Sequence, residues 1–129
     1  KRYLRNNFTP ASQIASLFWD YYEFTGDEEF LKERAYTFMK KASHFYLDRL
    51  EWDEEKNEYF LKASLYESAP IAYVKNPISD RNCIERLFKD CIRAAEILNV
   101  DKDEVKRVAV TYSIIYGKEA ISSLVNVAK

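Results

Sequence analysis

The feature of this sequence that most constrains its fold is a run of apolar residues spaced by four and three positions. The run comprises Leu31, Ala35, Phe38, Ala42 and Phe45, and Met39 and Tyr46 widen it. This spacing brings the side chains to one face of an α-helix, which has 3.6 residues per turn. The 129 residues include only two glycines and three prolines, a composition that disfavours a turn-rich β-sandwich. The sequence therefore predicts an all-α protein.

Two helices are expected before residue 51. Thr9 is a candidate N-cap, and Pro10 fits the first position of a helix that ends at Gly26. Asp27 is expected to cap the next helix, which runs to about Leu50. The apolar residues of the first helix that recur at helical spacing are Ile14, Leu17, Phe18, Tyr21 and Tyr22. Together the two segments predict one αα-hairpin over about residues 10–50.

A second hairpin is expected over about residues 80–116, followed by a tail at 117–129. Ser79 or Asp80 is expected to cap its first helix, which ends near Asn99, and Asp101 starts the next. The expected inward-facing residues are Ile84, Leu87, Phe88, Cys91, Ile92, Ala95 and Leu98, then Val105, Val108 and Tyr112. All 129 residues are interpreted as a single helical domain or a fragment of one.

Residues 51–79 separate the two hairpins and are predicted to form one irregular loop. Residues 51–58 are mostly acidic and are typical of a surface turn, and residues 59–61 are typical of a short strand. Residues 62–79 contain Pro70 and Pro77 and have no sustained periodicity. Loops of this length are uncommon in compact domains and often carry function, so this segment is the first place to look for a site.

Charge and hydropathy exclude several classes of partner. Lys and Arg number 20 against 21 Asp and Glu, which gives a net charge of −1. A nucleic-acid-binding domain normally has a basic surplus, so no nucleic-acid partner is expected. No apolar run approaches the roughly 20 residues that span a bilayer, so no membrane partner is expected. The chain begins at Lys1 without a signal peptide, as a processed or excised piece would.

The sequence contains no recognisable cofactor or metal motif. A Gly-rich phosphate loop, a Gly-x-Ser-x-Gly elbow and a paired-His motif are all missing from it. Cys83 and Cys91 would lie about 12 Å apart on one helix, which is too far for a disulfide. His44 is the only histidine and is expected to be a half-exposed surface or packing residue. We therefore expect no metal and no cofactor.

Glu67 is the strongest candidate for a chemical role. It lies in the long loop beside Tyr66, away from other acidic residues. A carboxyl group beside aromatic rings can have a raised pKa, which is the property that a general acid needs. Exposed aromatic residues can also stack on sugar rings. The helix that carries Trp19, Tyr21 and Tyr22 can bury all three only if it is covered on several sides, as in a double-layered ring.

Three segments carry a resemblance to a known family. Residues 17–31 read LFWDYYEFTGDEEFL, residues 42–48 read ASHFYLD, and residues 84–98 read IERLFKDCIRAAEIL. The first resembles the helical-hairpin signature of the α-L-fucosidases of glycoside hydrolase family 95, and the other two resemble later parts of the same domain. The resemblance covers roughly residues 10–105. Its Thr-Gly-Asp turn is shared by other six-hairpin glycosidases.

The resemblance implies a partial (α/α)6 toroid of helical hairpins and an oligosaccharide substrate. It implies that Glu67 occupies the place of the family's catalytic acid, although this sequence reads Leu65-Tyr66-Glu67-Ser68 where the family has Ser-Pro-Glu-Asn. Tyr66, Trp52 and Tyr59 are candidate substrate-binding aromatics. Family members are often exported, which favours a periplasmic or extracellular location.

Two functional hypotheses follow. In the first, the chain is a segment of an α-L-fucosidase-like catalytic domain. It is inactive alone, because glycoside hydrolysis needs two carboxyl groups and the segments matched here supply only one. In the second, the chain is a non-catalytic helical module that binds a protein partner or self-associates. A slice of a toroid should expose the helix faces that its neighbours would cover, and those faces could also drive self-association.

Overall fold

The computed structural model describes residues 9–63, 74–75 and 78–116, and most of them are helical. The order of elements is α1 (Thr9–Thr25), α2 (Glu28–Phe30), η2 (Leu31–Ala35), α3 (Tyr36–Arg49), β1 (Leu50–Asp53), β2 (Glu58–Ala63), β3 (Val74–Lys75), α4 (Ile78–Leu98) and α5 (Lys102–Tyr116). The expectation of a helical fold class is therefore confirmed, with a small sheet added.

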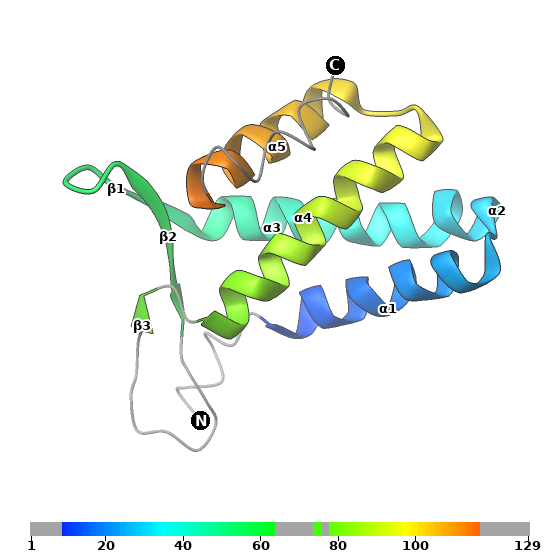
Figure 1. Cartoon of the computed structure of the whole chain (residues 1–129), viewed down its shortest axis with the longest axis horizontal. Helices are drawn as coiled ribbons and strands as arrows, with labels where there is room; N and C mark the ends of the chain where they lie inside the picture. Colours follow the sequence, from blue (N-terminus) through cyan, green and yellow to red (C-terminus); the bar gives the residue numbers. More distant parts are fainter. Residues whose placement is uncertain (1–8, 64–73, 76–77, 117–129) are drawn as a thin grey trace.

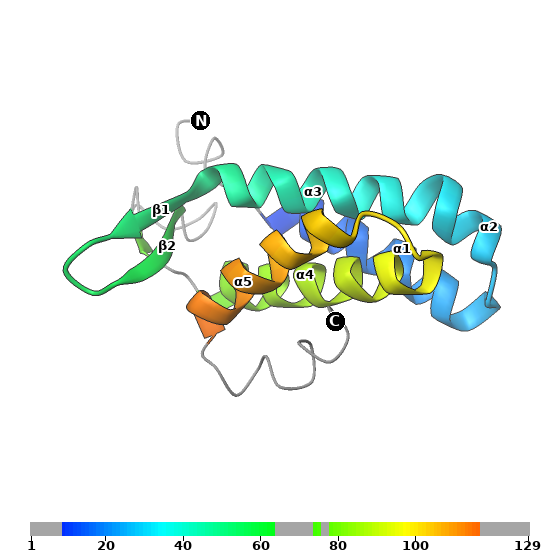
Figure 2. The same ribbon diagram turned by 90° about the horizontal axis from the view of Figure 1, so that it is seen from above.

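The helices form two hairpins that pack across each other (Figure 1). Helices α1 and α3 lie side by side, joined at one end through α2 and η2. Helix α4 packs on both of them, and α5 packs on α4 and α3. The β1–β2 ribbon continues from the end of α3 and extends beyond the helices (Figure 2). The sheet therefore lies at one end of the helical body.

The turn between α1 and α2 is built as the sequence predicts. Gly26 has a φ of 67°, a left-handed conformation that glycine adopts without steric cost. Its N–H donates to the carbonyl of Tyr22 at 2.7 Å. The side chain of Asp27 then accepts from the N–H of Phe30 at 3.0 Å, which caps α2. The Gly-Asp pair thus ends one helix and begins the next.

The helix that follows Asp27 is not uniformly an α-helix. Residues Leu31–Ala35 form a π-helical turn, in which the N–H of Tyr36 donates to the carbonyl of Leu31, five residues back. The expected stripe is largely buried, and Leu31, Ala35 and Met39 have no exposed surface. Phe45 is 37% exposed, so its assignment to this stripe was wrong. Tyr46, which the sequence placed beside the stripe, is buried as expected, and Tyr36 and Ser43 are buried in addition.

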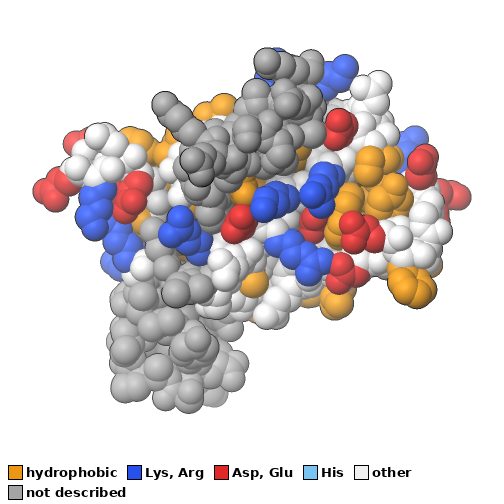
Figure 3. Space-filling view, in the orientation of Figure 1, with side chains coloured by type: hydrophobic (Ala, Val, Ile, Leu, Met, Phe, Trp, Pro, Cys, Tyr) orange, Lys and Arg blue, Asp and Glu red, His pale blue; other side chains and the backbone are white. Residues whose placement is uncertain are grey.

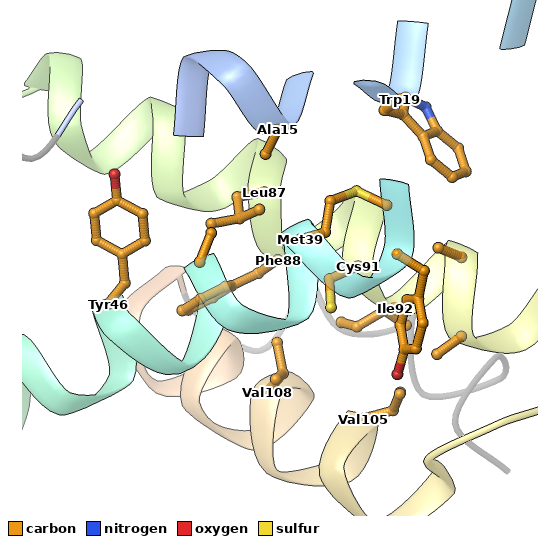
Figure 4. Packing of buried hydrophobic residues seen from close by; sticks show 14 of the residues in the cluster. Ala15, Trp19, Met39, Tyr46, Leu87, Phe88, Cys91, Ile92, Val105 and Val108 are labelled. Carbon is orange, nitrogen blue, oxygen red and sulfur yellow. The ribbon is translucent and has the colours of Figure 1, made fainter. Parts of the chain in front are cut away.

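Helix α4 forms the centre of the core. Of the residues expected to face inward from it, Leu98 is partly buried and six are buried. The six buried residues are Ile84, Leu87, Phe88, Cys91, Ile92 and Ala95. Figure 4 shows Leu87, Phe88, Cys91 and Ile92 of α4 among residues of the other helices, which are Ala15 and Trp19 of α1, Met39 and Tyr46 of α3, and Val105 and Val108 of α5. Helix α4 begins at Ile78, one or two residues before the expected cap, and ends at Leu98. Its expected apolar face is confirmed.

Helix α1 buries a different face from the expected one. Ser12, Ala15 and Trp19 are buried, with Phe18 and Tyr22 packed against the core. Of the five apolar residues that recur at helical spacing in the sequence, Ile14, Leu17 and Tyr21 are instead exposed, with exposed fractions of 44%, 66% and 48%. The spacing did not identify the buried face because α1 has apolar residues on two faces, and small Ala15 lets α1 approach α4 more closely than a large side chain would.

The segment expected to be an irregular loop contains the sheet. Strands β1 and β2 pair antiparallel, and β2 also pairs antiparallel with the short β3. Strand β2 confirms the extended run that starts near Tyr59. Strand β1 was missed because the acidic residues of the turn mask the alternation of Leu50 and Trp52. Asp53 accepts from the backbone N–H groups of Glu55 and Lys56, which reverses the chain.

Candidate functional site

Two of the aromatic residues singled out from the sequence are cross-strand partners. Trp52 of β1 lies opposite Tyr59 of β2 in the antiparallel ladder. Their ring centroids are 4.9 Å apart, and the ring planes meet at 69° in an edge-to-face contact. Trp52 is 45% exposed, and Tyr59 is partly buried beneath it. The pair therefore presents a supported, exposed indole at the sheet end of the molecule.

A charged contact joins β3 to this hairpin. The ammonium group of Lys75 pairs with the carboxylate of Asp53 and lies 4.1 Å from the ring centroid of Phe60. Hydrogen bonding from Lys75 is the largest cause of the lowered pKa of Asp53. These contacts connect β3 both to the turn after β1 and to β2. These contacts thus fix β3 against the end of the central strand β2.

Glu67 and Tyr66 lie outside the described residues, but both ends of their segment are placed. The segment 64–73 leaves β2 after Ala63 and enters β3 at Val74, and these two residues are register partners. The two residues that flank this segment therefore lie side by side at one end of the sheet. Tyr59 lies four residues from Ala63 on the same strand, a distance of about 13 Å. Whether Glu67 approaches the aromatic pair stays a prediction.

The base of the sheet holds a buried carboxyl group that sequence reasoning treated only as a helix cap. Asp80 is 3% exposed and accepts a hydrogen bond from the hydroxyl of Ser79 at 3.2 Å. Burial raises the pKa of Asp80. It lines a cavity of about 10 Å³ with Tyr59 and Arg81. That volume is far too small for a sugar ring, so the described residues around Asp80 offer no room for substrate.

His44 belongs to a second polar cluster, between α3 and the start of α5. Asp101 accepts from the hydroxyl of Tyr36 at 2.6 Å and from the ammonium of Lys40 at 2.9 Å. The Lys40 ammonium also lies 3.0 Å from Glu104, and His44 Nε2 lies 3.8 Å from the same Glu104 oxygen. The hydrogen bond from Tyr36 is the largest cause of the lowered pKa of Asp101. The cluster joins α5 to α3, and His44 is half-exposed, as expected.

A third polar cluster lines an open groove of about 440 Å³ between α1 and α4. Arg86 of α4 pairs with Asp20 of α1, and its Nε lies 3.4 Å from Asp90. The side chain of Asp90 is only 6% exposed. Burial raises its pKa to about 6 in spite of Arg86 and Arg93 nearby. Lys and Arg side chains alternate with acidic ones on this face of the molecule (Figure 3).

Metal and disulfide chemistry find no support among the described residues. No three His, Cys, Asp or Glu side chains in that part of the chain gather closely enough to hold a metal ion. Cys91 is buried and Cys83 partly buried, and both are free thiols. Burial raises the pKa of the Cys91 thiol to about 11. None of the described helices combines the length and apolarity needed to cross a bilayer.

Comparison with known proteins relates the chain to carbohydrate-active enzymes. The family described as the glycosyl hydrolase family 95 catalytic domain matches residues 4–123. Kojibiose hydrolase of Flavobacterium johnsoniae is 39% identical over 52 residues, which are 40% of this chain and 8% of that protein. Alpha-L-fucosidase 2 of Arabidopsis thaliana is 28% identical over 94 residues, which cover 66% of this chain and 11% of that protein. The chain thus spans about a tenth of the length of these relatives.

Proposed function

Because this chain belongs to the family of glycosyl hydrolase family 95 catalytic domains, we propose that it contributes to an active site that hydrolyses a glycosidic bond. Its helical hairpins are a partial (α/α)6 arrangement. The observation that carries the proposal is the exposed Trp52 of β1 supported by Tyr59 of β2. Strand β2 leads directly into the segment that contains Glu67. In this proposal the sheet end of the molecule faces the substrate.

Each candidate residue has a distinct part in the proposed reaction. The carboxyl group of Glu67 donates a proton to the oxygen of the leaving group as the glycosidic bond breaks. The exposed face of Trp52 packs against the C–H groups of a sugar ring, and Tyr59 holds the indole in place. Tyr66, the neighbour of Glu67 in the sequence, is the third proposed substrate-binding aromatic. A second carboxyl group, about 5–10 Å from the first, is required to activate water or attack the sugar.

The identity of the sugar is the finer part of the proposal. One relative carries the name of a kojibiose hydrolase and the other that of an α-L-fucosidase. The signature in residues 17–31 favours an α-L-fucoside as substrate. Both sugars belong in the assay, because a member of this family could act on either. No hydrolysis is expected from the 129-residue chain alone, since the reaction needs two carboxyl groups and the segments that resemble the family supply only Glu67.

The test is hydrolysis by the native polypeptide that contains this chain, with Glu67→Gln as the key variant. Loss of a general acid typically costs 10²–10⁴-fold in rate, and we expect a loss of about that size. The loss should be smaller for an aryl α-L-fucoside with a good leaving group, which needs little protonation. Glu55→Gln, which changes an exposed acid in the β1–β2 turn, is the matched control and should keep full activity.

The aromatic pair gives a separate test of substrate contact. Trp52→Ala should raise KM for the same substrate more than it lowers kcat, because stacking contributes to binding before the transition state. Phe45→Ala removes a partly exposed aromatic ring of α3 and should change neither constant. Equal effects of the two substitutions, or full activity in Glu67→Gln, would contradict the proposal. The alternative of a non-catalytic interaction module would then gain support.

A further inference from the structure

The open groove between α1 and α4 has the size of a small-molecule site. Its volume of about 440 Å³ lies within the roughly 300–1,000 Å³ of ligand pockets. Four of its side chains follow one another along α4 at intervals of four, three and four residues, and these are Asn82, Arg86, Lys89 and Arg93. At 100° per residue they fall within an arc of about 60°, so they share one face of the helix. Trp19 and Glu23 of α1 line the other side.

Two of the side chains that line the groove are buried. The side chain of Asp90 is 6% exposed, and Trp19 is 4% exposed. The Nε of Arg86 lies 3.4 Å from Asp90, and the same guanidinium pairs with Asp20 of α1. These contacts connect the two helices across the groove. Its polar groups are therefore held on rigid elements in the absence of a ligand, as in a preformed binding site.

Three exposed side chains of the groove have hydrogen-bonding capacity that the rest of the described structure does not use. Glu23, Asn82 and Arg93 form no side-chain hydrogen bond or ion pair with another described residue. Arg93 offers only donors, Glu23 only acceptors, and the Asn82 amide offers both. Lys89, in contrast, already pairs with Glu85 at 3.0 Å. The groove therefore presents both donors and acceptors to a ligand.

The charges around the groove nearly cancel. Three basic side chains face four acidic ones, namely Arg86, Lys89 and Arg93 against Asp20, Glu23, Glu85 and Asp90. Burial raises the pKa of Asp90 to about 6, so this carboxyl group is largely ionised at pH 7. An anionic ligand would meet a majority of carboxylates, and a cationic ligand would meet three cations. A neutral ligand is the one that this charge balance favours.

The neutral ligand that fits these groups is rich in hydroxyls. A hydroxyl group both donates and accepts, so neighbouring hydroxyls of a sugar can donate to Glu23 or Asp90 and accept from Arg93. Among the described residues that line the groove, Trp19 is the only large apolar one, and it is buried. The groove therefore offers no pocket for the apolar side chains of a peptide.

We propose that the groove between α1 and α4 binds a neutral oligosaccharide through Glu23, Asn82, Asp90 and Arg93. Arg93 lies 15 residues from the start of α4, about 22 Å along the helix axis from its sheet end. The site is thus separate from the aromatic pair of Trp52 and Tyr59. It goes beyond the proposed hydrolysis, because the catalytic role of Glu67 could fail while this site binds glycans, and the reverse also holds.

The test is binding of the native polypeptide that contains this chain to an array of neutral, uronate-containing and sulfated oligosaccharides. The protein carries Glu67→Gln, which prevents turnover, and Trp52→Ala, which removes the exposed indole at the sheet end. We expect this double variant to bind neutral glycans in preference to acidic ones. Because the ligand is uncharged, its affinity should change by less than about twofold between roughly 50 and 500 mM NaCl.

Titration calorimetry with the neutral glycan that binds best then measures the role of single residues. Arg93→Ala should weaken binding by about tenfold or more, since it removes charged donors, and Asn82→Ala should weaken it less. Arg107→Ala, which changes an exposed arginine of α5, is the matched control and should leave the affinity unchanged. Glu23→Gln keeps the size of its side chain and gives a further test if Arg93→Ala fails to fold.

Several outcomes would overturn the proposal. Binding that disappears with Trp52→Ala would place the glycan on the aromatic pair. A preference for uronate or sulfated glycans, with affinity that falls steeply as salt rises, would show that the groove selects anions. Equal losses from Arg93→Ala and Arg107→Ala would show that binding is not specific to the groove. Failure to bind any neutral glycan of the array would equally refute it.

Discussion

Helices α1 and α4 pack against each other, yet they use their apolar residues in different ways. Helix α4 is covered by α1, α3 and α5, and its large apolar residues from Ile84 to Ile92 are buried, whereas Ile97 near its end is 43% exposed. Helix α1 buries Ala15 and Trp19 but leaves Leu17 and Phe24 in solvent. A helix with a single apolar face has its partners within the described structure. A helix with two such faces has only one of them covered in the described structure.

The sharpest test of this comparison replaces a phenylalanine in each helix. Phe88 of α4 has no exposed surface, whereas Phe24 of α1 is 93% exposed. Phe88→Ala should lower the free energy of unfolding by about 3–5 kcal/mol, since it removes buried apolar surface and leaves a cavity. Phe24→Ala should change it by less than about 0.5 kcal/mol. Urea denaturation followed by circular dichroism measures both, and similar losses would show that Phe24 is packed after all.

A second test concerns the polar cluster between α1 and α4, in which Arg86 contacts Asp20 and Asp90. Burial raises the pKa of Asp90 to about 6, above its ordinary value of 3.8. Between about pH 4 and pH 6, the folded state therefore holds a proton on Asp90 that the unfolded state has lost. The stabilisation of the folded state by this bound proton disappears as the pH rises through about 6. Asp90→Asn should be more stable than the wild type by about 1–3 kcal/mol at pH 7.5, with the difference shrinking toward pH 4.

Thermal melts over that pH range measure the difference. Asp20→Asn provides the control, because Asp20 pairs with the same arginine but is exposed. An exposed ion pair contributes little, so this change should stay below about 1 kcal/mol. A pH-independent effect of Asp90→Asn would mean that the carboxyl group is better solvated than the structure indicates.

The smallest expected effect on stability is at the exposed apolar stripe of α1, which is formed by Ile14, Leu17, Tyr21 and Phe24. Leu17→Ser should shift the unfolding free energy of the 129-residue chain by no more than about 0.5 kcal/mol, since Leu17 is already in solvent. It should nevertheless reduce binding of a dye that reports exposed apolar surface. Ile97→Ser of α4 is the matched control, because Ile97 is exposed but belongs to no such stripe. Equal reductions from both substitutions would remove the distinction between the helices.

The same contrast explains what could be predicted from the sequence. The core face of α4 was predictable because it has one apolar stripe, from Ile84 to Ala95. The face of α1 was not, because Ile14 and Leu17 compete with Ala15 and Trp19 at the same helical spacing. Periodicity identifies apolar faces but does not say which one meets the neighbour within the chain. Tertiary contacts, such as the hydrogen bond from the backbone of Ser12 to the hydroxyl of Tyr46 at 3.3 Å, decide that choice.

The candidate site was predictable in part for a similar reason. Trp52 and Tyr59 were singled out as candidate substrate-binding aromatics, but their pairing depends on a hairpin that the acidic turn residues hide in the sequence. The local signal available in the sequence was Asn57, a residue type that tolerates the left-handed conformation of turns. In the structure Asn57 has a φ of 49°. The buried carboxyl groups of Asp80 and Asp90 could not have been identified, because their burial arises from helices that meet only in the folded chain. The role of Glu67 stays a prediction from resemblance.

The π-helical turn at Leu31–Ala35 bears on how the hairpin tolerates changes in chain length. Its extra residue is equivalent to a one-residue insertion into an otherwise regular α-helix. Lys32, Glu33 and Arg34 all face solvent, while Leu31 and Ala35 anchor the two ends in the core. Deletion of one of the three exposed residues would restore α-helical spacing and leave both anchors in register. A relative aligned with a single gap at this position would therefore share the same hairpin.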